Sequence, residues 1–310
     1  MGFQVLRSVI QAPLAKRSFL CKSCPSGLRV LYNNILLSSR SYSTKGSAFT
    51  LIKKLRQETN APIFLIKEAV EETNGQSFFE AKSVLSEKMK ARGQRLAQQL
   101  QGRVAKQGWI CTAILPDAQA ACMLELNCES DFVAQNPKIQ RLALSSASSI
   151  LHSLNRVNAD STEQRNVSTD LDSLKKIILH SDKDSSSNLG NTLFDAFSNA
   201  TSTTGERIEL SRAIVFQRTK PQHQLGRYTH GTDVRVHSSL GRVGCLVSLS
   251  NAQKAGLADD IAREFVAQDP ESIDDFLHNT SVYDNSKTMK DLLGSANVVD
   301  WVRWERGQAQ

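Results

Sequence analysis

Residues 127–136, "NCESDFVAQN", place an acid directly beside a large aromatic side chain, Asp131 and Phe132. An alternating apolar stretch leads into this segment and a helical pattern follows it. Asp131 could cap a helix beginning at Val133 or later by accepting hydrogen bonds from its first N–H groups. Phe132 could fold inward as ordinary core. A Phe that stays at a turn, within reach of water, would instead suggest contact with another molecule.

Metal chemistry would need cysteines or histidines at ligand spacing. Cys21 and Cys24 form a C-x-x-C pair, but no second pair and no nearby histidines complete a zinc site. His223, His230 and His237 recur every seven residues, through a predicted strand and turns, so they are not expected to share one face. The sequence therefore predicts no metal and no cofactor.

Catalytic signatures of the common enzyme classes are missing from the sequence. It has no glycine-rich phosphate loop, no G-x-S-x-G nucleophile elbow and no H-E-x-x-H zinc motif. We therefore expect a protein that acts by binding and is not an enzyme.

The elements that would position Asp131 and Phe132 follow from hydrophobic periodicity. Residues 47–93 show three helical patterns, the last expected to stop at Gly93, with Phe78 and Phe79 helping to fill a small core. From residue 108 the period changes to two, which predicts a β-hairpin before Asp131. A helix is then expected to begin at Asn136-Pro137.

The order of these elements predicts an α+β fold. Its parts are a three-helix module resembling ubiquitin-associated domains, a core of two similar α+β subdomains, and a short C-terminal module. The predicted ranges are 1–42 (transit peptide), 47–93 (three-helix module), 94–107 (linker), 108–204 (first subdomain, with a polar insert at 155–190), 205–283 (second subdomain) and 284–310 (C-terminal module).

The first 42 residues are rich in serine and contain six basic residues and no acid; the first acid of the chain is Glu58. This composition is typical of an organelle transit peptide, and "RSYS" predicts cleavage between Tyr42 and Ser43. The alternative is a basic tail that stays attached. Cleavage would lower the formal charge from +7 to +1, which removes most of the argument for nucleic-acid binding. No apolar stretch is long enough to span a membrane.

The segment "LELNCESDFVAQN" resembles the signature region of the elongation factor Ts family. Four more segments agree in the order of the family, and together they span roughly residues 48–307. They are "LIKKLRQETNAPIFLIKEAVEETNG", "GERIELSRAIVF", "YTHGTDVRVHSSLGRVGCLVSL", and "DNSKTMKDLL" followed by "VVDWVRWERG".

This resemblance implies a guanine nucleotide exchange factor for mitochondrial elongation factor Tu, located in the mitochondrial matrix. It assigns Phe132 to a wedge inserted between helices of the partner and Asp131 to the contact beside it, near the partner's magnesium-nucleotide site. His230 matches the histidine of the family's Tyr-x-His-Gly turn. Lys67 matches a basic residue of the N-terminal module that approaches the partner.

Three departures from the family pattern are visible, the first being Asn60 in Thr59-Asn60-Ala61-Pro62, where the family commonly has glycine. Residues 232–240 lengthen one loop, and only about fifteen residues separate Pro270 from Ser286, where bacterial members carry a long helical hairpin associated with self-association. We therefore expect a one-to-one heterodimer with the partner. The alternative function is a non-catalytic protein- or RNA-binding module of the mitochondrial matrix.

Overall fold

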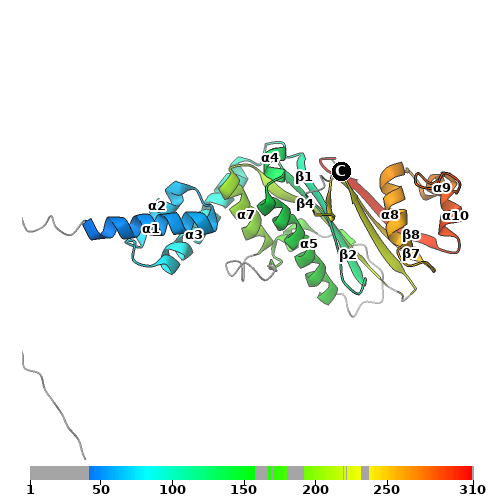
Figure 1. The fold of residues 1–310 in the computed structure, drawn as a ribbon, viewed down its shortest axis with the longest axis horizontal. Coiled ribbons are helices and arrows are strands. Elements are labelled where there is room, and N and C mark those ends of the chain that lie inside the picture. The colour runs from blue at the N-terminus through cyan, green and yellow to red at the C-terminus, as the bar shows by residue number, and fades with distance from the viewer. Residues whose placement is uncertain are drawn as a thin grey trace, which may run out of the picture. The chain divides into compact units, whose positions relative to one another are not determined.

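The computed structural model describes residues 42–157, 167–168, 170–179, 192–218, 220, 222–231 and 237–308. Figure 1 shows the helices and strands in chain order. Residues 1–41, which hold almost all of the expected transit peptide, fall outside the described residues, as do much of the expected polar insert and residues 232–236. Residues Gly46–Gln310 form one compact unit. Within the described residues, no helix is both long enough and apolar enough to cross a bilayer.

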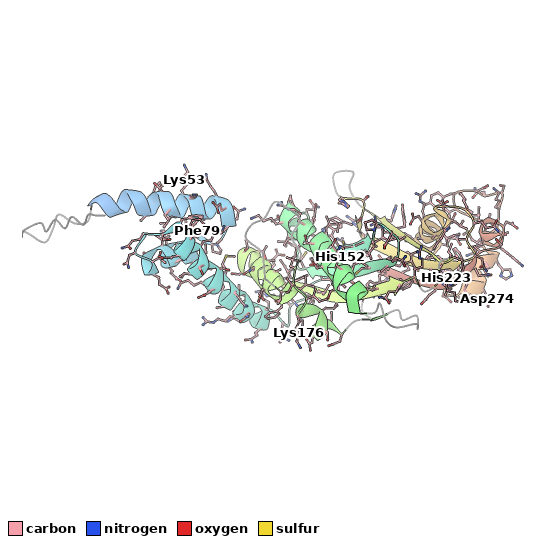
Figure 2. The ribbon with its side chains drawn as sticks, turned by 90° about the horizontal axis from the view of Figure 1, so that it is seen from below. Lys53, Phe79, His152, Lys176, His223 and Asp274 are labelled. Carbon is pink, nitrogen blue, oxygen red and sulfur yellow. The ribbon has the colours of Figure 1, made fainter. Side chains whose placement is uncertain are left out.

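Three helices open the described chain, as predicted: α1 (Tyr42–Thr59), α2 (Ile63–Glu72) and α3 (Phe78–Gln99). Their shared core includes Leu55, Ile66 and Leu85, and Phe78 packs against it. Phe79 was expected to fill this core as well, but its side chain is 82% exposed and lies outside the core. Figure 2 labels its position in this module.

The turns between these helices follow from residue type. Asn60, Asn74 and Gly75 have positive φ angles of 53°, 52° and 64°, a conformation that Asn and Gly adopt at low cost. Ser77 caps α3, since its hydroxyl accepts a hydrogen bond from the Glu80 N–H at 3.3 Å.

Helix α3 does not stop at Gly93 but continues to Gln99. A Cβ at Gly93 would lie 2.0 Å from the carbonyl oxygen of Ser198, which belongs to α7 (Leu193–Thr204). Gly93 is therefore the point where two helices approach closely, and not a helix stop. The first half of the predicted linker 94–107 is accordingly helical.

The first sheet has the strand order β3-β4-β2-β1-β6. Its strands are β1 (Gln107–Ile114), β2 (Ala120–Cys128), β3 (Val167–Ser168), β4 (Ile208–Gln217) and β6 (Leu240–Gly241). The predicted hairpin is the antiparallel pair β1 and β2. Helices α5 (Pro137–Val157) and α7 pack with these strands in one hydrophobic core (Figure 1). Helix α5 begins at the proline predicted for its first position, and the short helix α6 (Leu171–Lys175) lies against the same core.

The second sheet has the order β5-β7-β8. Its strands are β5 (Gln224–His230), β7 (Val243–Ser250) and β8 (Asn297–Glu305). Helices α8 (Leu257–Gln268), α9 (Ile273–His278) and α10 (Met289–Leu293) contribute to its core. The α+β class is as predicted. The strand pairing nevertheless crosses two predicted boundaries, because β4 joins the first sheet and β8 joins the second.

The two sheets pack against each other through a fourth apolar cluster, which includes Ile110, Met123, Phe216, Leu246 and Trp304. The molecule is therefore layered as helices, sheet, sheet and helices. Strand β2 was expected to alternate between buried and exposed residues, but all nine of its residues are buried. The second sheet covers the face that would otherwise meet water, which explains the difference.

An ion pair between neighbouring strands of the first sheet, β2 and β4, also contacts β8 of the second sheet and the residues that follow it. Arg212 Nε lies 2.6 Å from the Glu125 carboxylate, and the Arg212 guanidinium packs over the Trp304 ring with its carbon 4.4 Å from the ring centre. The Gly307 N–H also donates to Glu125 at 2.7 Å. This pairing accounts for an arginine that interrupts the apolar alternation of β4.

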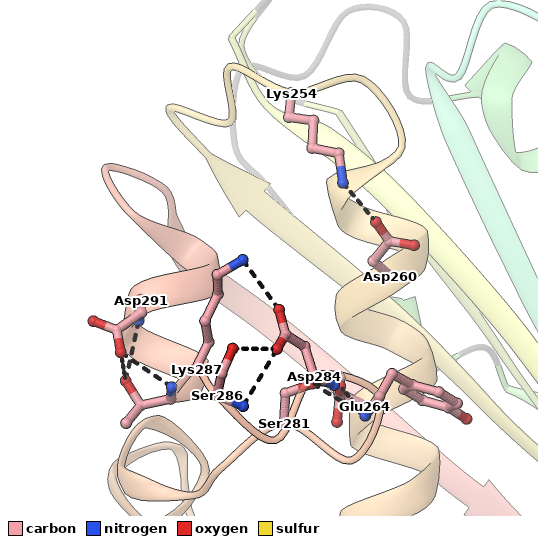
Figure 3. A network of polar contacts seen from close by, with 10 residues as sticks. Lys254, Asp260, Glu264, Ser281, Asp284, Ser286, Lys287 and Asp291 are labelled. Atoms are coloured by element: carbon pink, nitrogen blue, oxygen red, sulfur yellow. Dashed lines mark hydrogen bonds and ion pairs between the residues drawn. The ribbon is translucent and has the colours of Figure 1, made fainter.

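A polar network holds the loop after α9 against α8 (Figure 3). The buried Glu264 carboxylate accepts hydrogen bonds from the Ser281 hydroxyl and, at 3.0 Å, from the Val282 N–H. Asp291 of α10 accepts from both the N–H and the hydroxyl of Thr288, at 3.0 and 2.7 Å. The chain between α9 and β8 thus gains its shape from side-chain caps.

Candidate partner-binding site

Asp131 and Phe132 lie on α4 (Asp131–Ala134), a single helical turn that directly follows the end of β2. Ala134 is buried, and its carbonyl accepts a hydrogen bond from Trp109 Nε1 at 2.6 Å. Phe132, on the opposite side of the turn, is 84% exposed. The turn is therefore anchored by its inner residue and presents its aromatic ring to solvent.

Ser130, and not Asp131, caps this turn. The Ser130 hydroxyl accepts a hydrogen bond from the Val133 N–H at 3.3 Å. Asp131 is exposed, and the capping role considered for it from the sequence is wrong. The interpretation of Phe132 as ordinary core is also wrong, because its ring lies outside. Both side chains remain available for contact with another molecule.

The turn is braced by the segment that precedes β4. The Glu206 carboxylate accepts from the Ser130 N–H at 3.0 Å and from its hydroxyl at 2.7 Å. Glu129 accepts from the Arg207 N–H at 2.8 Å. We call these two pairs, Ser130–Glu206 and Glu129–Arg207, the clasp. Sequence reasoning missed them because the partners are more than seventy residues apart, and no spacing signal joins them.

His230 ends β5 and is exposed. Its ring stacks on Tyr228 with ring centres 6.4 Å apart. Its carbonyl accepts from the Arg242 N–H at 2.7 Å, while the next residue, Gly231, has a φ of 83°. The predicted turn after this histidine is therefore present.

Arg306 lies between the His230 turn and α4. Its N–H donates to the Arg242 carbonyl at 2.9 Å, and its guanidinium donates to the Gly108 carbonyl at 3.1 Å. Burial and the neighbouring Arg242 lower the pKa of Arg306, while Cys128 and then Asp131 act in the opposite direction. Gly108 pairs with Asn127 at the end of β2, so the Arg306 side chain reaches the strand ends that precede α4. The structure brings Asp131, Phe132 and His230 to the same end of the two sheets.

Lys67 is exposed on α2, in the three-helix module. It is not part of the group formed by α4 and the end of β5. Arg207 connects that module to the clasp, since its guanidinium donates to the carbonyls of Gln101 and Arg103 at 2.8 and 2.6 Å, just after α3.

Metal-binding clusters are not found within the described residues, where no three His, Cys, Asp or Glu side chains are arranged to hold an ion. Figure 2 shows His152 on α5 and His223 beside the second sheet, on separate elements. Among the described cysteines, Cys128 is nearest to the site in sequence. Burial, with a smaller effect of Glu206, raises its pKa to about 12.

Comparison with known proteins finds relatives that align with most of the chain. A family profile described as "Elongation factor TS" matches residues 129–289. Mitochondrial elongation factor Ts of Schizosaccharomyces pombe is 37% identical over 284 residues, which cover 87% of this chain and 92% of the relative. The chain belongs to the elongation factor Ts family.

Further elongation factor Ts relatives extend this similarity. The mitochondrial protein of Bos taurus is 29% identical over 88% of this chain and 84% of its own length. The protein of Aquifex aeolicus is 30% identical over 72% of this chain and 68% of its own. The family profile covers α4 and the end of β5, but it does not reach Lys67.

Proposed function

We propose that this protein is a guanine nucleotide exchange factor for mitochondrial elongation factor Tu. It promotes GDP release by placing α4 near the partner's magnesium-nucleotide site. The observation that carries the proposal is an exposed phenylalanine on a short turn that the rest of the fold holds in place. Membership of the elongation factor Ts family supports the choice of partner.

Exchange of this kind needs no covalent chemistry. A GTPase holds GDP and Mg²⁺ through phosphate and metal contacts. An exchange factor binds the nucleotide-free form better than the GDP-bound form. By linkage, the exchange factor weakens GDP binding to the GTPase by the same factor by which GDP weakens binding of the exchange factor.

The Phe132 ring can supply a substantial part of this preference. Burying a phenylalanine side chain contributes about 1.5–3 kcal/mol. That free energy corresponds to about one to two decades in an equilibrium constant. The remaining preference would come from a wider contact surface, in which single residues dominate and their neighbours exclude water.

The other site residues have supporting roles in this proposal. Asp131 contacts the partner beside the wedge, and His230 contacts it from the neighbouring turn at the same end of the sheets. Lys67 adds a positive charge from the three-helix module. The complex is a one-to-one heterodimer.

The mature protein works in the mitochondrial matrix, after removal of residues 1–42. The mitochondrial relatives and the acid-free, basic start of the chain support this location. N-terminal sequencing of the protein recovered from mitochondria is expected to begin at Ser43. A protein that retains Met1 or the residues next to it would contradict cleavage at this bond.

A stopped-flow assay tests the function directly. Mitochondrial elongation factor Tu is loaded with a fluorescent GDP analogue and mixed with excess unlabelled GDP. This protein is expected to accelerate release of the analogue in a saturable manner. No acceleration at saturating protein would exclude the exchange function and favour a binding module without it.

A further inference from the structure

Helix α4 has only four residues and cannot hold its conformation by itself. A single helical turn is unstable in isolation, because fixing its backbone costs more than its few hydrogen bonds return. Its conformation must therefore come from the contacts around it. The Ala134 carbonyl secures its C-terminal end, and the clasp secures its N-terminal end.

Glu206 makes the more specific half of the clasp. Its two carboxylate oxygens accept from the two donors of one residue, the N–H and the hydroxyl of Ser130. The same hydroxyl accepts from the Val133 N–H and so caps α4. Glu206 thus fixes both the position of the cap residue and the direction of its hydroxyl. Hydrogen bonds to a charged acceptor are also stronger than those between neutral groups.

The other half of the clasp connects α4 to the chain that follows α3. Glu129 accepts from the Arg207 N–H and, at 3.2 Å, from the Arg103 guanidinium. Arg207 in turn donates to the carbonyls of Gln101 and Arg103. The residues just before α4 are therefore held from two directions, by the segment that precedes β4 and by the segment that leads out of the three-helix module.

We propose that Glu206 is a positioning residue for Phe132. It holds α4 in the orientation that presents the ring outward, so that little order is lost when the ring is buried in a partner. The expected effect on GDP release rests on the proposed exchange function, but the positioning of α4 can be measured without a partner. Pre-organisation of a binding segment raises affinity by reducing the entropy lost on binding.

Glu206→Gln is the sharpest change, because an amide keeps the shape but replaces one acceptor oxygen with a donor. The variant is expected to accelerate hydrogen–deuterium exchange of the amides of residues 131–135 in the free protein. It is also expected to lower stimulated GDP release by about three- to tenfold, the effect of ordering one or two side chains on binding.

Asp291→Asn is a matched control. The Asp291 carboxylate accepts from the N–H and the hydroxyl of Thr288 at 3.0 and 2.7 Å, the same distances as those between Glu206 and Ser130. This control is expected to leave amide exchange at residues 131–135 and GDP release unchanged.

A double variant separates positioning from a general loss of structure. If Glu206 acts through the ring, Glu206→Gln has no further effect on GDP release in a Phe132→Ala background. An equal loss in both backgrounds would overturn the proposal, and so would unchanged amide exchange at residues 131–135. Should the wild-type protein fail to stimulate release at all, the proposed function falls, and amide exchange still decides whether Glu206 holds the turn.

Ser130 provides the second pair of variants, for the case that Glu206→Gln does not fold. Ser130→Ala removes the hydroxyl that both caps α4 and donates to Glu206, and it is expected to increase amide exchange in the same way. Ser130→Thr keeps a hydroxyl and is expected to restore the slow exchange. Equal amide exchange in the Ala and Thr variants would contradict the role of the Glu206–hydroxyl bond.

Discussion

Phe132 and Phe79 form a natural comparison, because the two rings are exposed to nearly the same extent, 84% and 82%. Phe132→Ala is expected to lower stimulated GDP release by about tenfold or more, since a phenylalanine buried in a complex contributes about 1.5–3 kcal/mol. The melting temperature is expected to change little, because substitutions at exposed positions usually alter stability by less than about 0.5 kcal/mol. Stopped-flow release and thermal unfolding are measured on the same preparation.

Phe79→Ala is the control for this experiment. It removes an equally exposed ring from the three-helix module, away from α4, so its effect on GDP release is expected to be much smaller. Equal losses from the two substitutions would mean that exposed aromatic surface in general, and not the α4 ring, drives exchange. A large loss of stability in Phe132→Ala would place its ring in a structural role.

The sequence predicted which residues form the candidate site, but not which contacts hold them in place. Asp131, Phe132 and His230 could be named because their types are unusual at a turn and because they match a family motif. Ser130 was not identified as the cap, since Asp and Ser are nearly equivalent in that position. The role of Glu206 could not be predicted from the sequence either, because its hydrogen bond to Ser130 forms only when β4 pairs with β2.

Between the elements, Gly93 sets the distance from α3 to α7. Gly93→Ala is expected to lower the free energy of unfolding, because the new Cβ would lie 2.0 Å from the Ser198 carbonyl oxygen. Overpacking of this kind costs about 1–3 kcal/mol, and the gain of about 1 kcal/mol in helix propensity only partly offsets it. Urea unfolding measures the difference.

Gly102→Ala is the matched control, since a Cβ at Gly102 would meet no atom within 4 Å. We expect no loss of stability there and a small gain from the less flexible unfolded chain. A Gly93→Ala protein as stable as the wild type would show that α3 and α7 can move apart at no cost. The close approach of the two helices would then have no structural importance.

Elements with a one-sided pattern were the ones predicted well. Helices α2 and α5 each bury one face, so apolar spacing predicts α2, and the Asn136-Pro137 start signal predicts where α5 begins, from local sequence alone. The end of α3 and the burial of β2 were missed for a common reason. Both depend on a second element, α7 for the glycine and the other sheet for the strand.

At the scale of the whole fold, the layered packing buries every cysteine of the described residues. Cys111, Cys122, Cys128 and Cys245 are all fully buried in the cores of the two sheets. Burial raises the pKa of Cys111 to about 12 and raises the pKa values of Cys122 and Cys245 further. Only the thiolate reacts at an appreciable rate. These four cysteines are therefore unreactive as long as the native packing of helices and sheets is maintained.

The rate of thiol labelling measures how often local or global unfolding exposes the buried cysteines. In a protein carrying Cys21→Ser and Cys24→Ser, no native thiol is expected to react with an aromatic disulfide reagent at pH 8 within minutes, and denaturant should release four. Cys128 is expected to be the first to react on mild destabilisation, because its thiol donates to the Ser130 carbonyl at 3.2 Å and it adjoins the clasp. Glu206→Gln should accelerate labelling of Cys128 and leave Cys245, in the other sheet, unchanged. Uniform acceleration of all four thiols would mean that the clasp stabilises the entire fold and not the turn that carries Phe132.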